Sequence, residues 1–364
     1  GAVRVVAVQG RWVYVGAGPQ LAVFAASPGD ALLQPITSVP LPGPVSALAV
    51  AERYAWAVAG QSLVVFDLAE PAAPRQAGML ALPAPSRSIA LRGPYAYLAA
   101  ADGGLRVLDL STPTAPREVG AILRTPTVAT WAPDRVAVVG SHLCVSSGGL
   151  IHFLSLQDPT RPDEVAIYEV DGGVRALAAA DHYVYFHCGN ECCGGPSEEF
   201  RTLDLADPRQ PRLAGTLGLR GRGVADLAVD GAHAYLVVAG NLHVIDVGEA
   251  TTPRLAASLQ LPAPAVGGVL AVAGRFAYLA AVGELLTIDA GDPANPRLAG
   301  ESQGITAGED ILGSDRRTLG ALAVSGDLAC ATAWREGDLA IFEDGMAILS
   351  LRDPARPRLV GYLP

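Results

Sequence analysis

The residues best suited to chemistry lie in a short segment that concentrates cysteine. Three of the five cysteines fall within HCGNECCGG, His187 to Gly195. Thiolates and imidazole suit Zn²⁺ or copper, so His187, Cys188, Cys192 and Cys193 form a candidate metal site. The spacing matches no strong zinc motif, and adjacent cysteines cannot easily reach one ion. A disulfide from Cys188 to Cys192 or Cys193, a strained Cys192–Cys193 bridge, and free thiols are the alternatives.

Arginines form a second candidate site, because they recur at one position just before a run of small apolar residues. Arg4, Arg87 and Arg175 occupy this position, and Ser46 and Asp134 stand in the same register. A guanidinium binds carboxylate or phosphate through paired hydrogen bonds, so such a cluster could hold an anionic molecule or glycan. Salt bridges to Asp134 or Asp226 are the structural alternative. The candidate ligand-binding residues are Arg4, Arg87, Asp134, Arg175 and Arg222.

Acidic residues gather in two stretches near the C-terminus. Their carboxylates could bind Ca²⁺, although neither stretch follows the EF-hand pattern and both could simply be solvated. The calcium candidates are Asp310, Asp315, Asp338 and Asp344. We predict no bound cofactor, and keep calcium or a transition metal as the alternative. The motif H-E-x-x-H and the phosphate loop are absent from the sequence.

A repeat of about 45 residues supplies the elements that must position these groups. Clear copies are LRVLDLSTPTAPREVG from Leu105, RTLDLADPRQPRLAG from Arg201 and LTIDAGDPANPRLAG from Leu286. Each unit contains four short runs that alternate in polarity and are separated by Gly or Pro, which predicts four β-strands. A unit of this length with four strands is typical of one β-propeller blade.

The third predicted strand ends in an aspartate that begins a fixed turn pattern. Counted from Asp67, proline follows at Pro71 and Pro74 and arginine at Arg75. Proline cannot continue a central strand, so this stretch must connect the third strand to the fourth. We expect the aspartates to accept backbone N–H groups of the turn rather than to act in catalysis. They are Asp67, Asp109, Asp204, Asp246 and Asp289.

The motif V-x-D-[LVA]-x-x-P-x-x-P-R resembles the LVIVD repeat, a β-propeller family common in bacterial and archaeal surface or exported proteins. The resemblance covers nearly the whole chain, with a degenerate first unit. It implies a propeller and a location outside the cytoplasm of a bacterium. It implies no substrate, since the functions of this family are largely undefined.

Eight units fit the chain, which predicts an all-β, eight-bladed propeller of four-stranded antiparallel blades in a single domain spanning residues 1–364. Blades four and eight share departures from the pattern, at Cys144 and Cys330 and at Ser155 and Ser350. This match four units apart favours eight blades over the alternative of seven. The blades span approximately residues 1–43, 44–85, 86–127, 128–172, 173–222, 223–266, 267–317 and 318–364.

The order of strands predicts how the ring closes and which face varies. The chain begins on an innermost strand and ends on an outermost one, so we expect closure by packing of blades one and eight rather than by a shared blade. Loops between the second and third strands, and between blades, open on one face, and the Asp–Pro turns lie on the other. All long insertions belong to the first face: residues 124–134, 187–200, 301–318 and 334–345.

Composition limits the classes of partner. The formal net charge is −10, with no lysine among the 26 basic residues, which argues against binding to nucleic acid. No apolar run reaches about 18 residues, so we expect no membrane span. Binding residues concentrate on loops that a rigid scaffold holds, and a propeller site is expected over the central channel.

These patterns together predict a monomeric extracytoplasmic binding or protein-interaction scaffold. Its partner would be a protein, or an anionic small molecule or glycan, on the insertion-bearing face. The alternatives are a hydrolase or lyase with a site over the channel, and a metal- or redox-linked protein centred on the Cys188–Cys193 loop. Whether the chain is an enzyme stays open at this point, because fold alone does not determine function.

Overall fold

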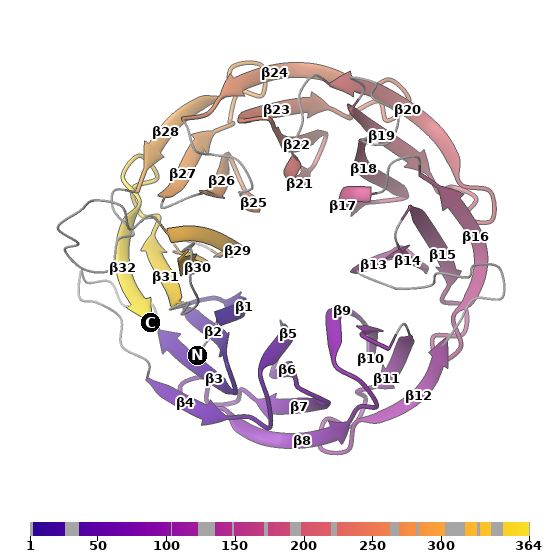
Figure 1. The fold of residues 1–364 in the computed structure, drawn as a ribbon, viewed down its shortest axis with the longest axis vertical. Helices are drawn as coiled ribbons and strands as arrows, with labels where there is room; N and C mark the ends of the chain where they lie inside the picture. Colours follow the sequence, from indigo (N-terminus) through magenta and orange to yellow (C-terminus); the bar gives the residue numbers. More distant parts are fainter. Residues whose placement is uncertain are drawn as a thin grey trace.

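In a computed structural model, the chain forms a ring of four-stranded antiparallel sheets around a central channel (Figure 1). Eight such sheets are present, which confirms the predicted fold and blade number over the alternative of seven. The described part of the chain contains no helix, and therefore none that could cross a membrane. The structure describes residues 3–25, 36–102, 104–122, 135–147, 149–170, 174–189, 198–219, 224–262, 269–281, 284–302, 317–325, 328–335 and 345–363.

Each blade is built from consecutive strands, the first innermost and the fourth at the rim. Blade 1 holds β1 (Val3–Gln9), β2 (Trp12–Ala17), β3 (Gln20–Ala25) and β4 (Thr37–Pro40). Blade 2 holds β5 (Val45–Ala51), β6 (Tyr54–Ala59), β7 (Ser62–Asp67) and β8 (Arg75–Ala81). Blade 3 holds β9 (Ser86–Arg92), β10 (Tyr95–Ala100), β11 (Leu105–Asp109) and β12 (Arg117–Ile122). Blade 4 holds β13 (Arg135–Val139), β14 (His142–Ser147), β15 (Leu150–Ser155) and β16 (Asp163–Glu169).

The second half of the chain repeats this order. Blade 5 holds β17 (Val174–Ala180), β18 (Tyr183–Gly189), β19 (Glu198–Asp204) and β20 (Arg212–Leu219). Blade 6 holds β21 (Val224–Asp230), β22 (His233–Val238), β23 (Asn241–Asp246) and β24 (Arg254–Gln260). Blade 7 holds β25 (Val269–Ala273), β26 (Phe276–Ala281), β27 (Glu284–Asp289) and β28 (Arg297–Glu301). Blade 8 holds β29 (Arg317–Ser325), β30 (Leu328–Arg335), β31 (Gly345–Ser350) and β32 (Arg358–Leu363).

A two-residue turn joins the first strand of a blade to the second in most blades. Its first residue has a positive φ, which fits the twist of a tight hairpin and favours glycine. Gly10 has φ 59° and Gly274 has φ 60° in this position. Glu52 and Asp181 hold the same conformation without glycine, at φ 51° and 54°.

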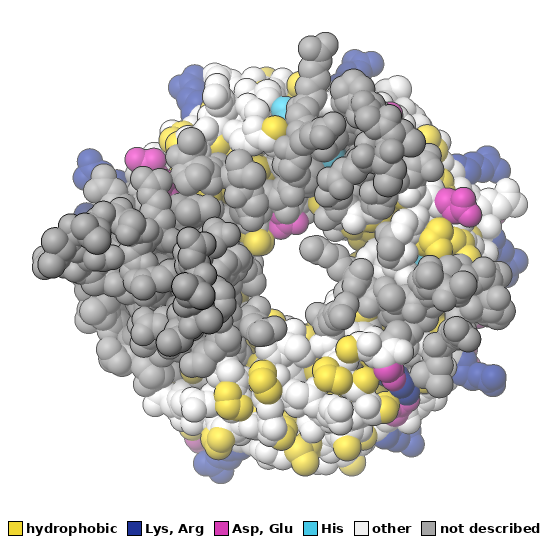
Figure 2. Space-filling view, viewed as in Figure 1, with side chains coloured by type: hydrophobic (Ala, Val, Ile, Leu, Met, Phe, Trp, Pro, Cys, Tyr) yellow, Lys and Arg dark blue, Asp and Glu magenta, His cyan; other side chains and the backbone are white. Residues whose placement is uncertain are grey.

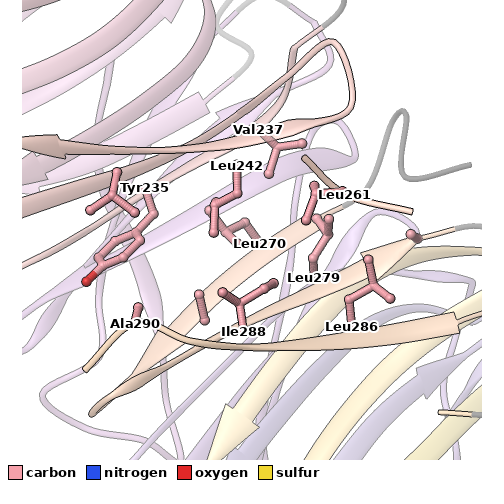
Figure 3. Packing of buried hydrophobic residues seen from close by; sticks show 12 residues of the cluster. Tyr235, Val237, Leu242, Leu261, Leu270, Leu279, Leu286, Ile288 and Ala290 are labelled. Carbon is pink, nitrogen blue, oxygen red and sulfur yellow. The ribbon is translucent and has the colours of Figure 1, made fainter. Parts of the chain in front are cut away.

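The hydrophobic core is divided among the junctions between neighbouring blades. Apolar side chains on both faces of each sheet pack against the adjacent sheets, so every blade contributes to two clusters of buried residues. Figure 3 shows the cluster between blades 6 and 7, where Tyr235, Val237 and Leu242 pack against residues that include Leu270 and Ile288. Comparable clusters fill the other junctions.

The ring closes by packing between its first and last blades, as the order of strands predicts. Each sheet is formed from one continuous stretch of chain, so the two ends do not share a blade. Val13 and Phe24 of blade 1 are buried against Cys330 and Ile348 of blade 8 in one cluster. Closure therefore depends on side-chain burial rather than on strand pairing.

Candidate functional site

The aspartates that end the third strands stabilise the turns that follow them, as the sequence predicts. In each case Oδ1 accepts a hydrogen bond from the backbone N–H two residues later, at 2.7 to 3.0 Å. These bonds satisfy donors that would otherwise be unpaired in a turn. The aspartates are Asp67, Asp109, Asp204, Asp246 and Asp289.

Arginines pair with three of these carboxylates. Arg53 donates to both oxygens of Asp67, at 2.7 and 2.6 Å, and with the Ala69 N–H this lowers the pKa of Asp67 to about 2. Hydrogen bonds from Ser111 and Arg117 lower the pKa of Asp109 to about 2. Arg275 likewise lowers the pKa of Asp289. Carboxylates this acidic stay ionised at neutral pH, so they are poor general acids.

The opposite face carries a repeated irregularity at the start of the first strands. The pairing register of β1 with β2 shifts between Val3 and Val5, which leaves Arg4 as the extra residue of a β-bulge. The same shift places Ser46 in blade 2, Arg87 in blade 3 and Arg175 in blade 5 at bulges. Bulges re-aim side chains and are common beside binding sites. The predicted common register of these arginines is therefore present at the channel mouth.

Hydrogen bonds between neighbouring blades fix the backbone around this mouth. Ser46 Oγ donates to the Ser86 carbonyl at 2.6 Å, which links blade 2 to blade 3. Asp226 Oδ2 accepts from the Leu270 N–H at 3.1 Å and links blade 6 to blade 7. Asp226 thus has a structural role in the mouth. These two hydrogen bonds connect the first strands of neighbouring blades.

Several predicted site residues lie outside the described residues, so the structure does not test their roles. At the mouth these are Asp134 and Arg222. The calcium candidates Asp310, Asp315, Asp338 and Asp344 also lie outside the described residues, and calcium binding stays a prediction. In the portion of the chain that is described, no group of three or more His, Cys, Asp or Glu side chains could hold a metal ion.

The structure places His187 and Cys188 on opposite faces of β18, since successive side chains of a strand alternate. Cys188 is buried among Phe153, Phe186 and other residues of the blade 4–5 junction. His187 is fully buried and its strand partners are Ala176 and Phe200. These two residues do not converge on one point from these positions.

The other two cysteines of the predicted cluster, Cys192 and Cys193, lie outside the described residues. No disulfide bond occurs within the described ranges. The loop disulfide and the metal site therefore both stay predictions. Cys144 and Cys330, in contrast, are buried thiols whose pKa is raised by burial, which makes them unreactive.

A series of polar side chains on the third strands, buried except for the partly exposed Arg201, is not predicted by the sequence patterns. They occupy one register position in four consecutive blades, and each faces a polar partner. Arg106 binds Asp102 and Glu118, and His152 Nδ1 lies 2.8 Å from Glu164 Oε2. The series is Arg106, His152, Arg201 and His243. Aligning the third strands by register would have revealed it.

Between the bulges and their last residues, the described first strands carry mainly small apolar side chains. The first strands there carry alanine, valine, leucine and isoleucine side chains that are partly exposed, such as Ala49, Ala90, Ala178 and Ala271.

Comparisons with known proteins agree with this geometry. The family model "LVIVD repeat" matches residues 42–80, 85–123, 221–260 and 268–303, which correspond to blades 2, 3, 6 and 7. A search of curated proteins finds no match. The bulges at Arg4 and Arg175 thus lie in blades that depart from the family pattern, whereas Arg87 lies in a matched repeat.

Solved structures with similar folds are other β-propellers. The computationally designed Ika8 protein is 14% identical, with a TM-score of 0.67 over 91% of this chain and 93% of its own. The Hsv2p structure from Kluyveromyces lactis is 13% identical, with a TM-score of 0.56 over 79% of this chain and 93% of its own. The Cps50 (Swd1) β-propeller domain from Myceliophteria thermophila is 12% identical, with a TM-score of 0.54 over 77% and 93%. At these identities the likeness shows the fold alone.

Proposed function

We propose, on the premise that this chain is a β-propeller built from LVIVD repeats, that it is a binding or protein-interaction scaffold. Its insertion-bearing face would form the binding surface. The fold supports this proposal because a propeller holds its loops on a rigid frame, and such loops commonly bind partners. The described carboxylates of the opposite face stabilise turns and are not available for catalysis.

The single observation that carries the proposal is the repeated bulge in the first strands. It gives Arg4, Arg87 and Arg175 the same register position in blades 1, 3 and 5. The sequence thus puts an arginine at the same end of three first strands, and the excess of positive charge that these residues bring favours an anion there. A carboxylate or phosphate can take two parallel hydrogen bonds from each guanidinium. The proposed ligand is therefore an anionic small molecule, an anionic glycan, or an acidic region of a protein.

We further propose that the protein acts as a monomer outside the cytoplasm of a bacterium. The LVIVD repeats support this location, because the family that they resemble is common in surface and exported proteins. Cell fractionation tests the location, and sedimentation velocity tests the oligomeric state. Recovery of the full chain from the cytoplasm alone would contradict the proposal.

Titration with polygalacturonate and with inorganic phosphate tests the anion site. The double variant Arg87→Gln/Arg175→Gln should weaken binding by tenfold or more and reduce its dependence on salt, because each lost charge removes a screened attraction. The control is Arg75→Gln, whose side chain is 81% exposed on the rim. Thermal melting checks that both variants fold.

Two results would count against the scaffold. Equal binding of both probes by the wild type and the double variant, or no binding at all, would contradict an anion site at the mouth. Cleavage of polygalacturonate during the titration, lost in the Arg87→Gln/Arg175→Gln variant, would instead support the alternative of a hydrolase or lyase over the channel.

A further inference from the structure

An unusual row of exposed leucines lies on the outer strands of the last blades. Leu213 is 47% exposed, Leu255 45% and Leu298 40%, and Leu359 is partly exposed. All four have the same register, opposite the next-to-last residue of the third strand. We call this set the leucine rim: Leu213, Leu255, Leu298 and Leu359. A contiguous exposed apolar patch can mark an interaction surface, and two members of the set, Leu298 and Leu359, line one groove.

The earlier blades show that the fold does not require leucine at this position. There the same register holds Gln76, Glu118 and Glu164. Two of these residues have partners within their own blade: Glu118 accepts from Arg106 at 3.2 Å, and Glu164 lies 2.8 Å from His152. Blades 3 and 4 therefore use this position for internal contacts, whereas blades 5 to 8 expose an aliphatic group there.

Arginine precedes every member of the leucine rim. Arg212, Arg254, Arg297 and Arg358 are all exposed. Figure 2 shows that most of the described dark blue side chains lie around the edge of the ring. Carboxylates of the adjacent turns, Asp207, Asp292 and Asp353, accept backbone N–H groups of their own turns. Both signs of charge are therefore present beside the leucines, with an arginine next to each leucine on a chain that is acidic as a whole.

A groove lies between two members of the leucine rim, at the junction of blades 7 and 8. Its volume is about 670 Å³, and its lining includes Leu298 and Glu301 of β28 with Arg356, Arg358 and Leu359 of blade 8. Gly300 forms its floor beside Ala355, and a Cβ there would lie 2.2 Å from the Ala355 carbonyl oxygen. β28 is the last strand of its sheet, so its outer edge has no strand partner within the blade.

We propose that this groove binds an extended, acidic segment of a partner protein in which aliphatic residues alternate with carboxylates. The segment would pair with the open edge of β28, and its aliphatic side chains would pack between Leu298 and Leu359. Its carboxylates would meet Arg356 and Arg358, whose positive charges outnumber that of Glu301. Such strand addition uses main-chain hydrogen bonds for affinity and alternate side chains for specificity.

Fluorescence anisotropy with a short synthetic peptide of alternating glutamate and leucine tests this proposal. Leu298→Gln and Arg358→Gln should each weaken binding by about tenfold, as expected for a residue at the centre of an interface. The matched control is Met79→Gln, which removes a side chain that is 54% exposed on the rim of blade 2. Peptides of glutamate with serine, and of lysine with leucine, should bind at least tenfold more weakly.

Amide hydrogen exchange locates the bound peptide. The glutamate–leucine peptide should slow exchange in β28, while the Arg87→Gln/Arg175→Gln variant should bind it as the wild type does. The latter result separates this site from the channel mouth. Three results would overturn the proposal: a loss of peptide affinity in Met79→Gln as large as in Leu298→Gln, binding of the glutamate–serine peptide as tight as that of the glutamate–leucine peptide, or unchanged exchange in β28. So would a concentration-dependent dimer that Leu298→Gln abolishes, since the occupant would then be a second copy of the chain.

Discussion

Cys144 lies directly opposite Phe153 in the paired register of β14 and β15, and both side chains are buried in the blade 4–5 junction. Other blades combine a large ring on the second strand with a small residue on the third, such as Tyr97 with Val107. Blade 8 follows blade 4, because Cys330 lies opposite Ile348. Blades 4 and 8 thus have the larger side chain of this pair on the third strand, whereas the other blades have it on the second strand.

Restoring the ring in blade 4 should destabilise the protein. In Cys144→Tyr a large side chain must enter a junction that Phe153 already fills, and overpacking of this kind costs about 1–3 kcal/mol. Phe153→Val should also destabilise by creating a cavity. The double variant has the Tyr–Val pair of the other blades, so its free energy of unfolding should exceed the value expected from adding the two single effects. Denaturant unfolding measures this coupling. If the two changes in free energy of unfolding were strictly additive, the two side chains would not compensate for each other.

Glycines on the fourth strands allow close contact between blades, and substitution should be costly there. A Cβ at Gly120 would lie 2.0 Å from the Thr160 carbonyl oxygen of the next blade. Gly120→Ala should therefore lower the free energy of unfolding by about 1–3 kcal/mol, because the backbone must move. Gly218→Ala is the control, since no atom lies within 4 Å of its added Cβ. Similar unfolding midpoints for the two variants would refute the contact.

Ring closure should depend on Phe24, which is 1% exposed at the blade 1–8 junction. Phe24→Ala should cost about 3–5 kcal/mol, as for other large-to-small changes in a core. Amide exchange should accelerate in β1–β3 and also in β29–β31, which are distant in sequence. Phe66→Ala, at the blade 1–2 junction, should leave exchange in β29–β31 unchanged. The same exchange pattern in both variants would show that closure does not depend on Phe24.

Acid should destabilise the turns that the aspartates hold. The pKa of Asp67 and of Asp109 is about 2 in the folded chain, below the value of about 4 for an unfolded aspartate. Their contribution to stability is therefore complete above about pH 4 and is lost as pH falls toward 2. Asp109→Asn should melt at a lower temperature at neutral pH and show a weaker dependence on pH between 4 and 2. Glu169→Gln, which changes an exposed carboxylate of β16, should behave as the wild type.

Thiol labelling followed by mass spectrometry distinguishes the cysteines. Cys144 and Cys330 should resist iodoacetamide in the native protein, because both are buried and burial raises their pKa. They should react once the chain is unfolded. The predicted loop disulfide would appear as a loss of two protons among Cys188, Cys192 and Cys193, and a bound metal as added mass. Labelling of Cys330 in the native state would contradict its burial.

The strands and the turns were predictable because their determinants are local and repeated. The Asp–Pro turn recurs at fixed spacing, and the carboxylate of Asp204 needs only the N–H two residues later. The four predicted strands are present in every blade, since hydrophobic alternation sets strand positions. The register of Arg4, Arg87 and Arg175 follows from the same repeat.

Contacts between blades were not predictable from the same patterns. The pairing of Cys144 with Phe153 requires the register of two strands, and the contact of Gly120 with Thr160 requires the position of the next sheet. The opposite directions of His187 and Cys188 follow from a strand that extends into a segment expected to be a loop. The first and third cases depend on where strands begin and pair within one blade, and the second depends on the neighbouring blade, so the repeat pattern alone determines none of them.

The junctions between blades 4 and 5 and between blades 8 and 1, where the larger side chain is on the third strand, affect how the ring can be assembled. A chain of identical blades could close in several ways, because any blade could dock against any other and a ring could omit one. The junctions after blade 4 and after blade 8 differ in shape from the rest and lie half a turn apart. The chain fixes the order of the blades, but a ring that closed one blade early would pack blade 1 against blade 7, whose large side chain is on the second strand, and this mismatch acts against the wrong blade number. In this chain, departure from the repeat helps to define how many blades the ring contains.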